Sequence, residues 1–571
     1  MLRYKTYAIL ACALMVVGAC KTRHRAESGG DVVAWTPPKP DEIDGVTVDA
    51  VKGAIEKRLT GATPSGVNAD TWRHVRALYA GYGGAPLWLD KAGLSTDRVH
   101  ELANALASAD SDAIRVADYP IKDLAGAVTS LRSAKPPTAE QLADADVLMT
   151  STFAALGEDL LTGQVNPKTV SQSWFISTRE DGIDSALAQT LRESPVDKSI
   201  QLIRPQDPTY DSLRVELMRY RALAAKGEWP KVPAGPALKP GESDARTRLT
   251  ALAERLRAEG YLGPDSSSAD SAQSRTGRMK YDRVLAGAVA NFQAHHDIGV
   301  DSMLGPETVD ALNEPVSFRV GQIAANLERY RWLPRSLGQR YILVNVPAFE
   351  LTAYDSGKTA LQMKVIVGQD YQGKATPVFS DSMEFVVFRP YWIVTDSIAN
   401  KEIYPKAEAD PTYLDRNNYE IVTIEHRKRV RQKPGDKNSL GLVKFMFPND
   451  FNIYLHDTPQ GELFNKDVRA FSHGCIRLQH PDQLAQFVLG WPMDSVHREM
   501  QSGPDDHRVN LKHKIPVYIV YFTTYEKDGQ LYFGNDLYKR DDKLVQSVAA
   551  AAQSDSASAR AVQTLREAPS E

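Results

Sequence analysis

Apolar residues recur at helical spacing through the first part of the chain. Ala- and Leu-rich stretches with this spacing predict helices, and Gly83-Gly84 and Asn166-Pro167 break the pattern. These features predict an α-helical scaffold domain over residues 67–228. Four prolines between residues 230 and 240 then predict a stiff spacer. The predicted helical stretches include residues 97–108, 140–162 and 212–226.

A shorter module over residues 242–315 carries two apolar helical faces. Leu249, Leu252 and Leu256 share the first face, and Gly260 closes that helix. The second face repeats the spacing, and a third helix begins at Pro306, so we predict a three-helix domain. The polar residues 266–277 are expected to loop out of it. Adjacent residues point apart on a helix, so His295 and His296 are expected at the surface rather than on a metal. The second face consists of Tyr281, Leu285, Val289 and Phe292.

Short runs of β-branched and aromatic residues begin at Tyr341 and predict strands. Only residues 397–407 and 481–489 interrupt them with helical patterns. We therefore predict a mainly-β domain over residues 338–526, folded as a sandwich or a barrel-like sheet. The fold class is thus multidomain, with an α-helical scaffold, a three-helix module and a mainly-β domain.

The two ends of the chain differ in composition from these domains. Residues 20–66 are rich in Gly, Pro, Ser and charge, which predicts a flexible tether. Residues 543–571 are rich in Ala, Ser and Gln and are expected to form a disordered or frayed tail.

Composition and charge exclude several classes of protein. Hydrophobic residues make up 42% and charged residues 25%, as in ordinary globular proteins, and the net charge is −4. The one basic cluster, residues 427–431, is predicted to be a solvated loop face, so no nucleic-acid partner is expected. No apolar stretch after residue 20 reaches membrane-spanning length.

The chain contains 3 cysteines, Cys12, Cys20 and Cys475. Residues 1–19 join basic residues to a short apolar core, which predicts a secretory signal peptide. Its end, from Val17 to Cys20, resembles a bacterial lipobox, so we expect cleavage before Cys20 and lipidation of its sulfur. The protein would then be periplasmic and anchored by lipid. The outer membrane is favoured because Lys21 follows the cysteine, where an Asp usually retains lipoproteins in the inner membrane. Cys475 would remain the free thiol, either reactive or buried and inert.

Cys475 stands in a small-residue turn, and His456 precedes it by 19 residues. A thiol attacks a carbonyl as thiolate, so it needs a base, which His456 can supply. Backbone amides around Gly474 can converge on a developing oxyanion. The sequence therefore predicts acyl transfer through a thioester.

The histidine followed by Ser472-His473-Gly474-Cys475 resembles the signature of the L,D-transpeptidases with a YkuD-type catalytic domain. Residues 326–334, 344–351, 388–394 and 444–449 also resemble the large subgroup, which has a helical scaffold and a peptidoglycan-binding domain. Residues 242–315 resemble that binding domain. The matching positions are Phe292, Gln293, Gly299, Asp301, Gly305, Thr308, Leu312 and Asn313.

This resemblance implies roles for individual residues. Cys475 is the expected nucleophile and His456 the general base and acid, with the backbone carbonyl of Asp457 orienting the imidazole. The amides of His473, Gly474 and Cys475 are expected to form the oxyanion hole. Arg477 is expected to bind a substrate carboxylate, with a loop-supporting salt bridge as the alternative. Ser472, Tyr454 and Trp392 complete the predicted substrate contacts, and no metal or cofactor is expected.

The implied reaction cross-links stem peptides of peptidoglycan. The thiolate displaces terminal D-alanine, and an amine of a second stem takes the acyl group to give a 3–3 cross-link. Stem peptides, glycan and other wall synthases are the expected partners. The acceptor stays open between a stem peptide, a wall lipoprotein and water. Residues 405–440 are placed to act as a lid.

Two other classes of function remain open from the sequence. A zinc-dependent wall peptidase could use His456, His473 and Cys475 as ligands, although the acidic signature of such enzymes is missing. A non-catalytic lipoprotein could bind glycan through residues 242–315 alone, but it would not need the Ser-His-Gly-Cys turn.

Overall fold

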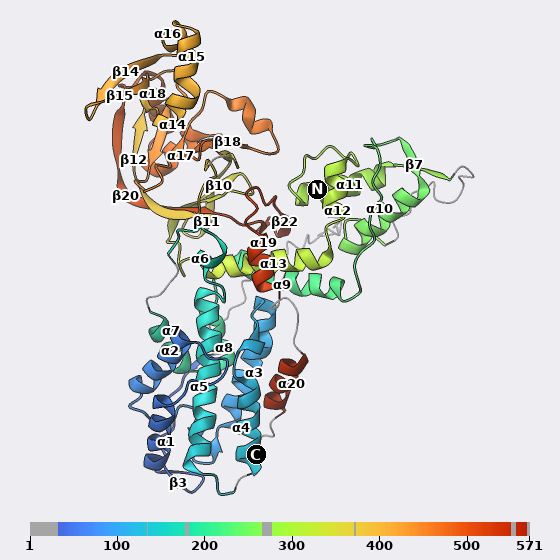
Figure 1. Cartoon of the computed structure of the whole chain (residues 1–571), viewed down its shortest axis with the longest axis vertical. Helices are drawn as coiled ribbons and strands as arrows, with labels where there is room; N and C mark the ends of the chain where they lie inside the picture. Colours follow the sequence, from blue (N-terminus) through green and yellow to red (C-terminus); the bar gives the residue numbers. More distant parts are fainter. Residues whose placement is uncertain are drawn as a thin grey trace, which may run out of the picture.

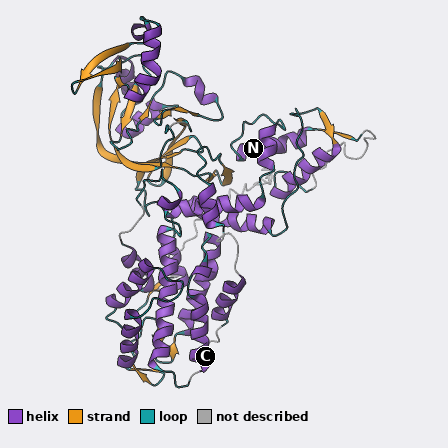
Figure 2. Ribbon diagram, viewed as in Figure 1, coloured by secondary structure: helices purple, strands orange, loops and turns teal. Residues whose placement is uncertain are grey.

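A computed structural model describes residues 32–133, 135–177, 182–264, 277–370, 373–549 and 556–567. Three domains surround a central pair of helices, α9 (Pro208–Ala224) and α13 (Val316–Arg331), as Figure 1 shows. A helical domain lies below this pair, a β-rich domain above it and a small helical module to its right (Figure 2). The predicted multidomain fold class is confirmed. The predicted signal peptide, Cys20 and nearly all of the predicted loop at 266–277 lie outside the described residues.

The helical domain is built around α5 (Ala139–Thr162). Most residues of this helix are buried, because apolar residues occupy most of its circumference. Over the described residues, every helix is too short or too polar to cross a bilayer. The other helices of this domain are α1 (Val48–Thr60), α2 (Ala69–Gly81), α3 (Thr96–Ala109), α4 (Ile121–Ser133), α6 (Pro167–Val170), α7 (Ile183–Leu191) and α8 (Val196–Ser199).

Both predicted flexible ends are corrected in part. Within the predicted tether, strands β2 (Glu42–Ile43) and β3 (Val46–Thr47) lead into α1, and Ile43, Val51 and Ile55 are fully buried in the core of the helical domain. Within the predicted tail, α19 (Asp542–Val548) packs on α13, and α20 (Ser556–Arg566) packs on α3 and α4. Both segments are polar overall but contain apolar residues at helical spacing, and tertiary packing buries these residues. Overall composition therefore did not indicate the helices.

The small module has the three predicted helices, α10 (Arg246–Glu259), α11 (Arg283–His295) and α12 (Pro306–Leu312), and a hairpin of β7 (Ser243–Ala245) and β8 (Arg278–Lys280). The first predicted apolar face is confirmed, because Leu249, Leu252 and Leu256 are fully buried. Gln293 is also buried. Its side chain donates to Asp301 and Thr308 and accepts from the amide of Ser302, so it holds the turn before α12.

The predicted surface position of His295 and His296 is wrong. A hairpin of β21 (Thr524–Lys527) and β22 (Gln530–Phe533) covers both rings. The ring of His295 lies 2.6 Å from Gln530 Oε1, and His296 stacks between Phe292 and Phe533. The covering hairpin is more than 200 residues away in the chain, so helical spacing alone could not predict the burial.

The β-rich domain is a mixed sheet that closes on itself. Its strand order is β10-β9-β20-β12-β16-β17-β19-β11-β18, and β10 also pairs with β11. The sheet is therefore a barrel with β18 attached to β11. Helices α17 (Pro481–Leu489) and α18 (Met493–Ser502) pack beside it, and α17 ends at the predicted Gly490. The strands are β9 (Arg340–Asn345), β10 (Glu350–Asp355), β11 (Lys358–Gly368), β12 (Phe379–Phe388), β16 (Val443–Met446), β17 (Leu455–His456), β18 (Ala470–Ser472), β19 (Ile476–Leu478) and β20 (His507–Val520).

Residues 392–432 form a small subdomain on the barrel, which we call the cap. It has its own buried cluster of Val394, Ala399, Ile403 and Val430. Residues 427–431 lie in strand β15 and not in the predicted loop; Arg427 and Lys428 are exposed as predicted, whereas Val430 is buried. The cap elements are β13 (Trp392–Ile393), α14 (Asp396–Ile398), the π-helix η4 (Ala399–Ile403), α15 (Tyr404–Ala409), α16 (Tyr413–Arg416), β14 (Tyr419–Ile424) and β15 (Arg427–Gln432).

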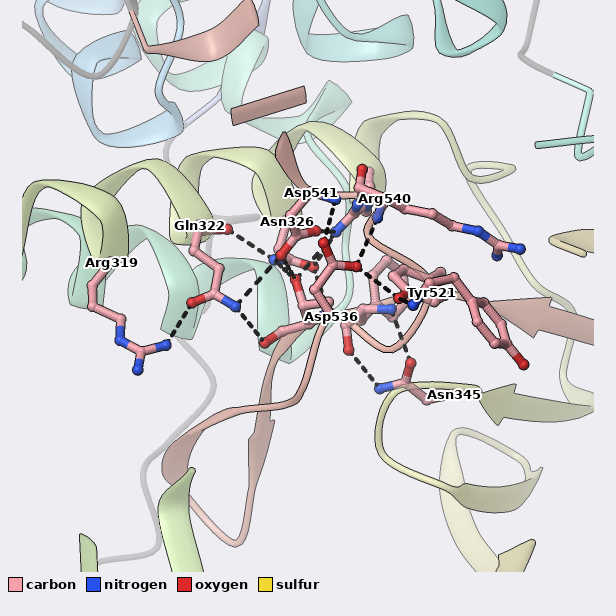
Figure 3. Close-up of polar contacts among 12 residues, drawn as sticks. Arg319, Gln322, Asn326, Asn345, Tyr521, Asp536, Arg540 and Asp541 are labelled. Carbon is pink, nitrogen blue, oxygen red and sulfur yellow. Dashed lines mark hydrogen bonds and ion pairs between the residues drawn. The ribbon is translucent and has the colours of Figure 1, made fainter. Parts of the chain in front are cut away.

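A buried polar network joins α13 to the barrel, as Figure 3 shows. Asn326 exchanges hydrogen bonds with Thr523, donating to its Oγ1 at 3.0 Å and accepting from its amide at 3.0 Å. Arg329 forms an ion pair of 2.6 Å with Asp541, which also accepts from the Thr523 hydroxyl. The network fixes the central helix pair against the barrel.

Candidate active site

One face of the neighbouring strands β16, β17 and β19 is apolar and the other is polar. Side chains alternate across a strand, so the residues between the apolar ones point to the opposite face. The apolar face packs into the barrel core and consists of Val443, Phe445, Leu455, Ile476 and Leu478.

The polar face carries two rows of side chains. Lys444 pairs with His456 in the antiparallel β16–β17 register, and His456 pairs with Arg477 in the parallel β17–β19 register. These three residues therefore form one row. The same parallel register puts Tyr454 beside Cys475 in the next row, and the Tyr454 and His456 rings lie 5.7 Å apart between centroids. The structure thus brings Cys475 and His456 to one face of the sheet, in adjacent rows.

The thiol of Cys475 is half-buried. Its Sγ lies 3.8 Å from the carbonyl oxygen of Asn452 and also contacts Tyr454. Burial raises the pKa of Cys475 to about 11, more than the contacts with Tyr454 and the charge of Arg477 lower it. The thiol is therefore protonated at neutral pH.

The imidazole of His456 is buried and oriented by the next residue. Its Nδ1 lies 2.5 Å from the carbonyl oxygen of Asp457, so Nδ1 carries the proton and Nε2 is free to accept one. Burial, with smaller contributions from the charges of Arg477 and Lys444, lowers the pKa of His456 to about 3. The ring is therefore a neutral base.

The carboxylate of Asp457 has a different role from its carbonyl. It accepts from the amides of Leu442 at 2.8 Å and Thr458 at 2.7 Å. Gly441 leaves room for it, since a Cβ there would lie 2.3 Å from the carboxylate carbon and φ is +61°. The carboxylate thus fixes the strand end that presents the orienting carbonyl.

The turn before Cys475 is held by its own side chains. Gly474 has φ +115°, a left-handed conformation that only glycine adopts readily. The buried Ser472 hydroxyl donates to the Cys475 carbonyl at 2.5 Å and accepts from the Gly474 amide at 3.1 Å. These contacts correct two predictions, because Ser472 supports the turn instead of facing the substrate, and the Gly474 amide already has an acceptor. The amides of His473 and Cys475 have no acceptor among the described residues.

Three family matches cover successive parts of the chain. Residues 339–519 match the YkuD family, described as an L,D-transpeptidase catalytic domain. Residues 73–217 match a scaffold domain, and residues 246–312 match a family provisionally described as a peptidoglycan binding domain.

The chain carries an L,D-transpeptidase catalytic domain of the YkuD family. The recognition from the Ser-His-Gly-Cys turn is thereby confirmed.

A protein of Haemophilus influenzae, provisionally named as an L,D-transpeptidase, is 32% identical over 243 residues. The match covers 39% of this chain and 48% of the relative, so the chain spans about half the length of the curated relative it matches.

Two solved structures of L,D-transpeptidases were also found. The one from Xylanimonas cellulosilytica has a TM-score of 0.16 at 15% identity and covers 50% of this chain and 99% of its own. The one from Stackebrandtia nassauensis has a TM-score of 0.20 at 14% identity. That match covers 53% of this chain and 99% of the solved one. Similarity at this level supports no conclusion about activity.

The turn of the L,D-transpeptidase domain rests on Thr376, which the sequence analysis missed. The buried Thr376 hydroxyl donates to the Gly474 carbonyl at 2.9 Å and accepts from the Gly368 amide at 3.0 Å. Its backbone carbonyl accepts from Arg540, and its amide donates to the Tyr538 hydroxyl at 3.3 Å. Thr376 therefore links the turn to residues 538–540, beyond the matched range 339–519.

The cap contacts the turn through Glu402. His473 Nε2 lies 2.6 Å from Glu402 Oε1, and Lys374 Nζ lies 3.6 Å from the same oxygen. Partial burial opposes ionisation of Glu402, but the contacts with His473 and Lys374 outweigh it and lower its pKa. A second contact runs from Trp392 to the hydroxyl of Tyr454, which also touches the Cys475 thiol. Trp392 and Tyr454 thus lie at the site.

Arg477 and Lys444 place positive charge on both sides of His456. Arg477 donates to the neutral amide oxygen of Gln460 at 2.6 Å. Among the described residues, neither cation forms a salt bridge, so the loop-supporting salt bridge considered for Arg477 is absent there. Lys444 was missed as a site residue, although its alternation with Phe445 placed it on the polar face.

The three candidate zinc ligands are not grouped for metal binding. His473 faces Glu402, while His456 uses Nδ1 on a carbonyl. In the described parts of the chain, no three His, Cys, Asp or Glu side chains are arranged to hold a metal ion. The geometry gives the zinc peptidase alternative no support.

Proposed function

We propose that the protein is a peptidoglycan L,D-transpeptidase that forms 3–3 cross-links through a thioester on Cys475. The observation that best supports this is the neutral imidazole of His456. Its Nδ1 is held by the Asp457 carbonyl, and it shares one sheet face with the thiol. A neutral imidazole with an unoccupied Nε2, on the same sheet face as a protonated thiol and in the adjacent row, suits general-base activation.

The reaction would begin with transfer of the thiol proton. As Sγ of Cys475 bonds to the carbonyl carbon, His456 Nε2 takes that proton. The oxygen becomes an oxyanion, to which the amides of His473 and Cys475 can donate. When the tetrahedral species collapses, the bond to terminal D-alanine breaks, and the imidazolium returns the proton to the leaving amine. Each oxyanion donor is worth about 10²–10³ in rate in comparable enzymes.

The second half-reaction would run in the opposite sense. The amine of an acceptor stem attacks the thioester, and His456 removes its proton. The new amide leaves, and Cys475 is released as thiol. Attack by water instead gives a shortened stem and no cross-link. The cationic row of Lys444 and Arg477 fits a substrate carboxylate, because Arg pairs with carboxylates through two hydrogen bonds.

Mass spectrometry with a disaccharide-tetrapeptide tests the proposal. The expected results are an adduct on Cys475 that lacks terminal D-alanine, and a dimeric product when acceptor is added. Cys475→Ser should give neither. Conversion that persists after specific alkylation of Cys475 would exclude the thioester route.

The predicted export route also belongs to this proposal. We propose cleavage after residue 19, lipidation of Cys20 and a periplasmic site of action, with anchoring in the outer membrane. Peptidoglycan-acting domains support a location at the cell wall. Cys20→Ala should move the protein from the membrane to the soluble periplasmic fraction, and unchanged fractionation would contradict the anchor.

A further inference from the structure

A segment of the helical domain extends the β-barrel. The amide of Phe175 donates to the carbonyl of Val378 at 2.7 Å, and the amide of Val378 donates to the carbonyl of Ser173 at 2.8 Å. These two bonds attach residues 173–175 beside the start of β12. Between them, the buried Trp174 packs edge-on against Trp332 at 4.8 Å between ring centroids. The backbone of Phe175 is therefore fixed to the L,D-transpeptidase domain.

The ring of Phe175 is large, apolar and half in solvent. It is 49% exposed, and one side of the ring packs on Phe451 at 4.6 Å between centroids. Phe451 in turn packs on Phe379 of β12 at 5.0 Å. An exposed aromatic ring packed on a half-buried one is typical of binding surfaces.

The aromatic pair is coupled to the nucleophile by the loop that contains Phe451. The next residue, Asn452, places its carbonyl oxygen 3.8 Å from Sγ of Cys475. Asn449 fixes this loop, since its amide group donates to the carbonyl of Ile453 at 2.7 Å and accepts from the amides of Phe451 and Ile453. The loop therefore fixes the position of Phe451 relative to Sγ of Cys475.

We propose that Phe175 and Phe451 form an apolar contact surface for the stem peptide, so that the helical domain supplies part of the substrate-binding site. This inference rests on the proposed function. The attacked carbonyl must approach Sγ to about 3–3.5 Å, so the peptide on one side of it would pass close to Asn452, the chain neighbour of Phe451. Methyl and methylene groups of a stem peptide gain by covering exposed aromatic surface.

Phe175→Ala tests the proposal in the full chain. Its backbone bonds to Val378 remain, so the barrel attachment is kept. Conversion of the disaccharide-tetrapeptide should lose about tenfold in kcat/KM, the usual order for truncating an aromatic contact. The rate of Cys475 alkylation by iodoacetamide, which needs no substrate contact with Phe175, should stay within about twofold. Phe175→Tyr should retain activity.

Val215→Ala is the matched control, because Val215 is an exposed apolar residue of α9 in the same part of the chain. It should change neither rate. Equal kcat/KM for Phe175→Ala and the unchanged protein would overturn the inference. A parallel loss of alkylation would also overturn it, because Phe175 would then act on the nucleophile loop alone. No conversion by the unchanged protein, despite normal alkylation, would instead reject the proposed function and the inference with it.

Discussion

At the scale of residues, the thiol and the imidazole are both neutral at rest. Burial raises the pKa of Cys475 to about 11 and lowers that of His456 to about 3, and both shifts disfavour an ion pair. Lys444 and Arg477 add to the effect of burial on the histidine, since two cations in its row oppose a third. In the proposed reaction, the thiolate would therefore form during attack, when the proton moves to His456.

The pH dependence of Cys475 alkylation should show this neutral state. Thiolate is the reactive form, so below the thiol pKa the rate should rise about tenfold per pH unit. With the pKa at about 11, we expect the rise to continue from pH 6 to pH 10 without a plateau. Peptide mapping after iodoacetamide treatment measures the rate at Cys475. A plateau near neutral pH would indicate a thiolate–imidazolium pair and contradict this prediction.

Thr376→Val removes the hydroxyl that supports the turn. It should lower kcat without affecting substrate binding. The variant keeps the shape but leaves the Gly474 carbonyl and the Gly368 amide without the hydroxyl. An unsatisfied buried group costs about 1–3 kcal/mol, so kcat for tetrapeptide conversion should fall roughly ten- to a hundredfold with little change in KM. Thr376→Ser retains the hydroxyl and should restore kcat, which a simple packing role would not predict.

The sequence predicts the proposed catalytic pair, but not the residues that hold it in place. The Ser-His-Gly-Cys turn and the alternation around His456 are local patterns, so Cys475 and His456 could be found. Thr376 and Glu402 come from segments far away in the chain, and nothing near them in the sequence marks a contact with the turn. The Gly474 amide and the Ser472 hydroxyl were misassigned because local hydrogen bonds within a turn depend on its dihedral angles.

At the scale of elements, the cap is a separate unit that meets the turn at few points. Its own cluster of four buried apolar residues holds it together. Glu402, in the π-helix η4, is its charged contact with the turn, and π-helices are frequent at functional sites. We propose that the cap, residues 392–432, is the mobile lid that was expected at residues 405–440.

Glu402→Gln should loosen the cap. The variant keeps an acceptor oxygen but removes the charge that attracts Lys374 and His473. A partly exposed charged contact contributes up to about 1 kcal/mol, so amide exchange across residues 392–432 should speed up by about threefold to fivefold. Glu420→Gln is the matched control, because its partners Arg431 and Lys433 lie in the cap or directly beside it and not on the turn. Equal exchange in both variants would argue against a closing contact.

At the scale of the whole molecule, distant parts of the chain complete one domain. Helix α20 buries Ala561, Val562 and Leu565 in the core of the helical domain, against α3 and α4. The domain order and the three fold types could be predicted from spacing and composition. The packing of α20 on the helical domain could not be predicted, because the sequence of an Ala- and Ser-rich helix does not indicate which distant helices it contacts.

Leu565→Ala should destabilise the helical domain selectively. Removing a buried leucine side chain costs about 2–5 kcal/mol, and Leu565 is 1% exposed. The midpoint of denaturant unfolding of the helical domain should fall, while the alkylation rate of Cys475 stays unchanged. Gln563→Ala, at an exposed position of the same helix, should leave the midpoint unaltered. Equal midpoints for both variants would mean that α20 contributes little to the core.

The packing of α20 also bears on the order of events during biosynthesis. A ribosome releases α3 and α4 long before residues 556–566 exist, so the apolar surface between these helices stays uncovered while the barrel is being translated. The helical domain thus leaves the exit tunnel before the barrel but is completed after it. A nascent chain of this protein would need protection from aggregation until residues 556–566 have emerged.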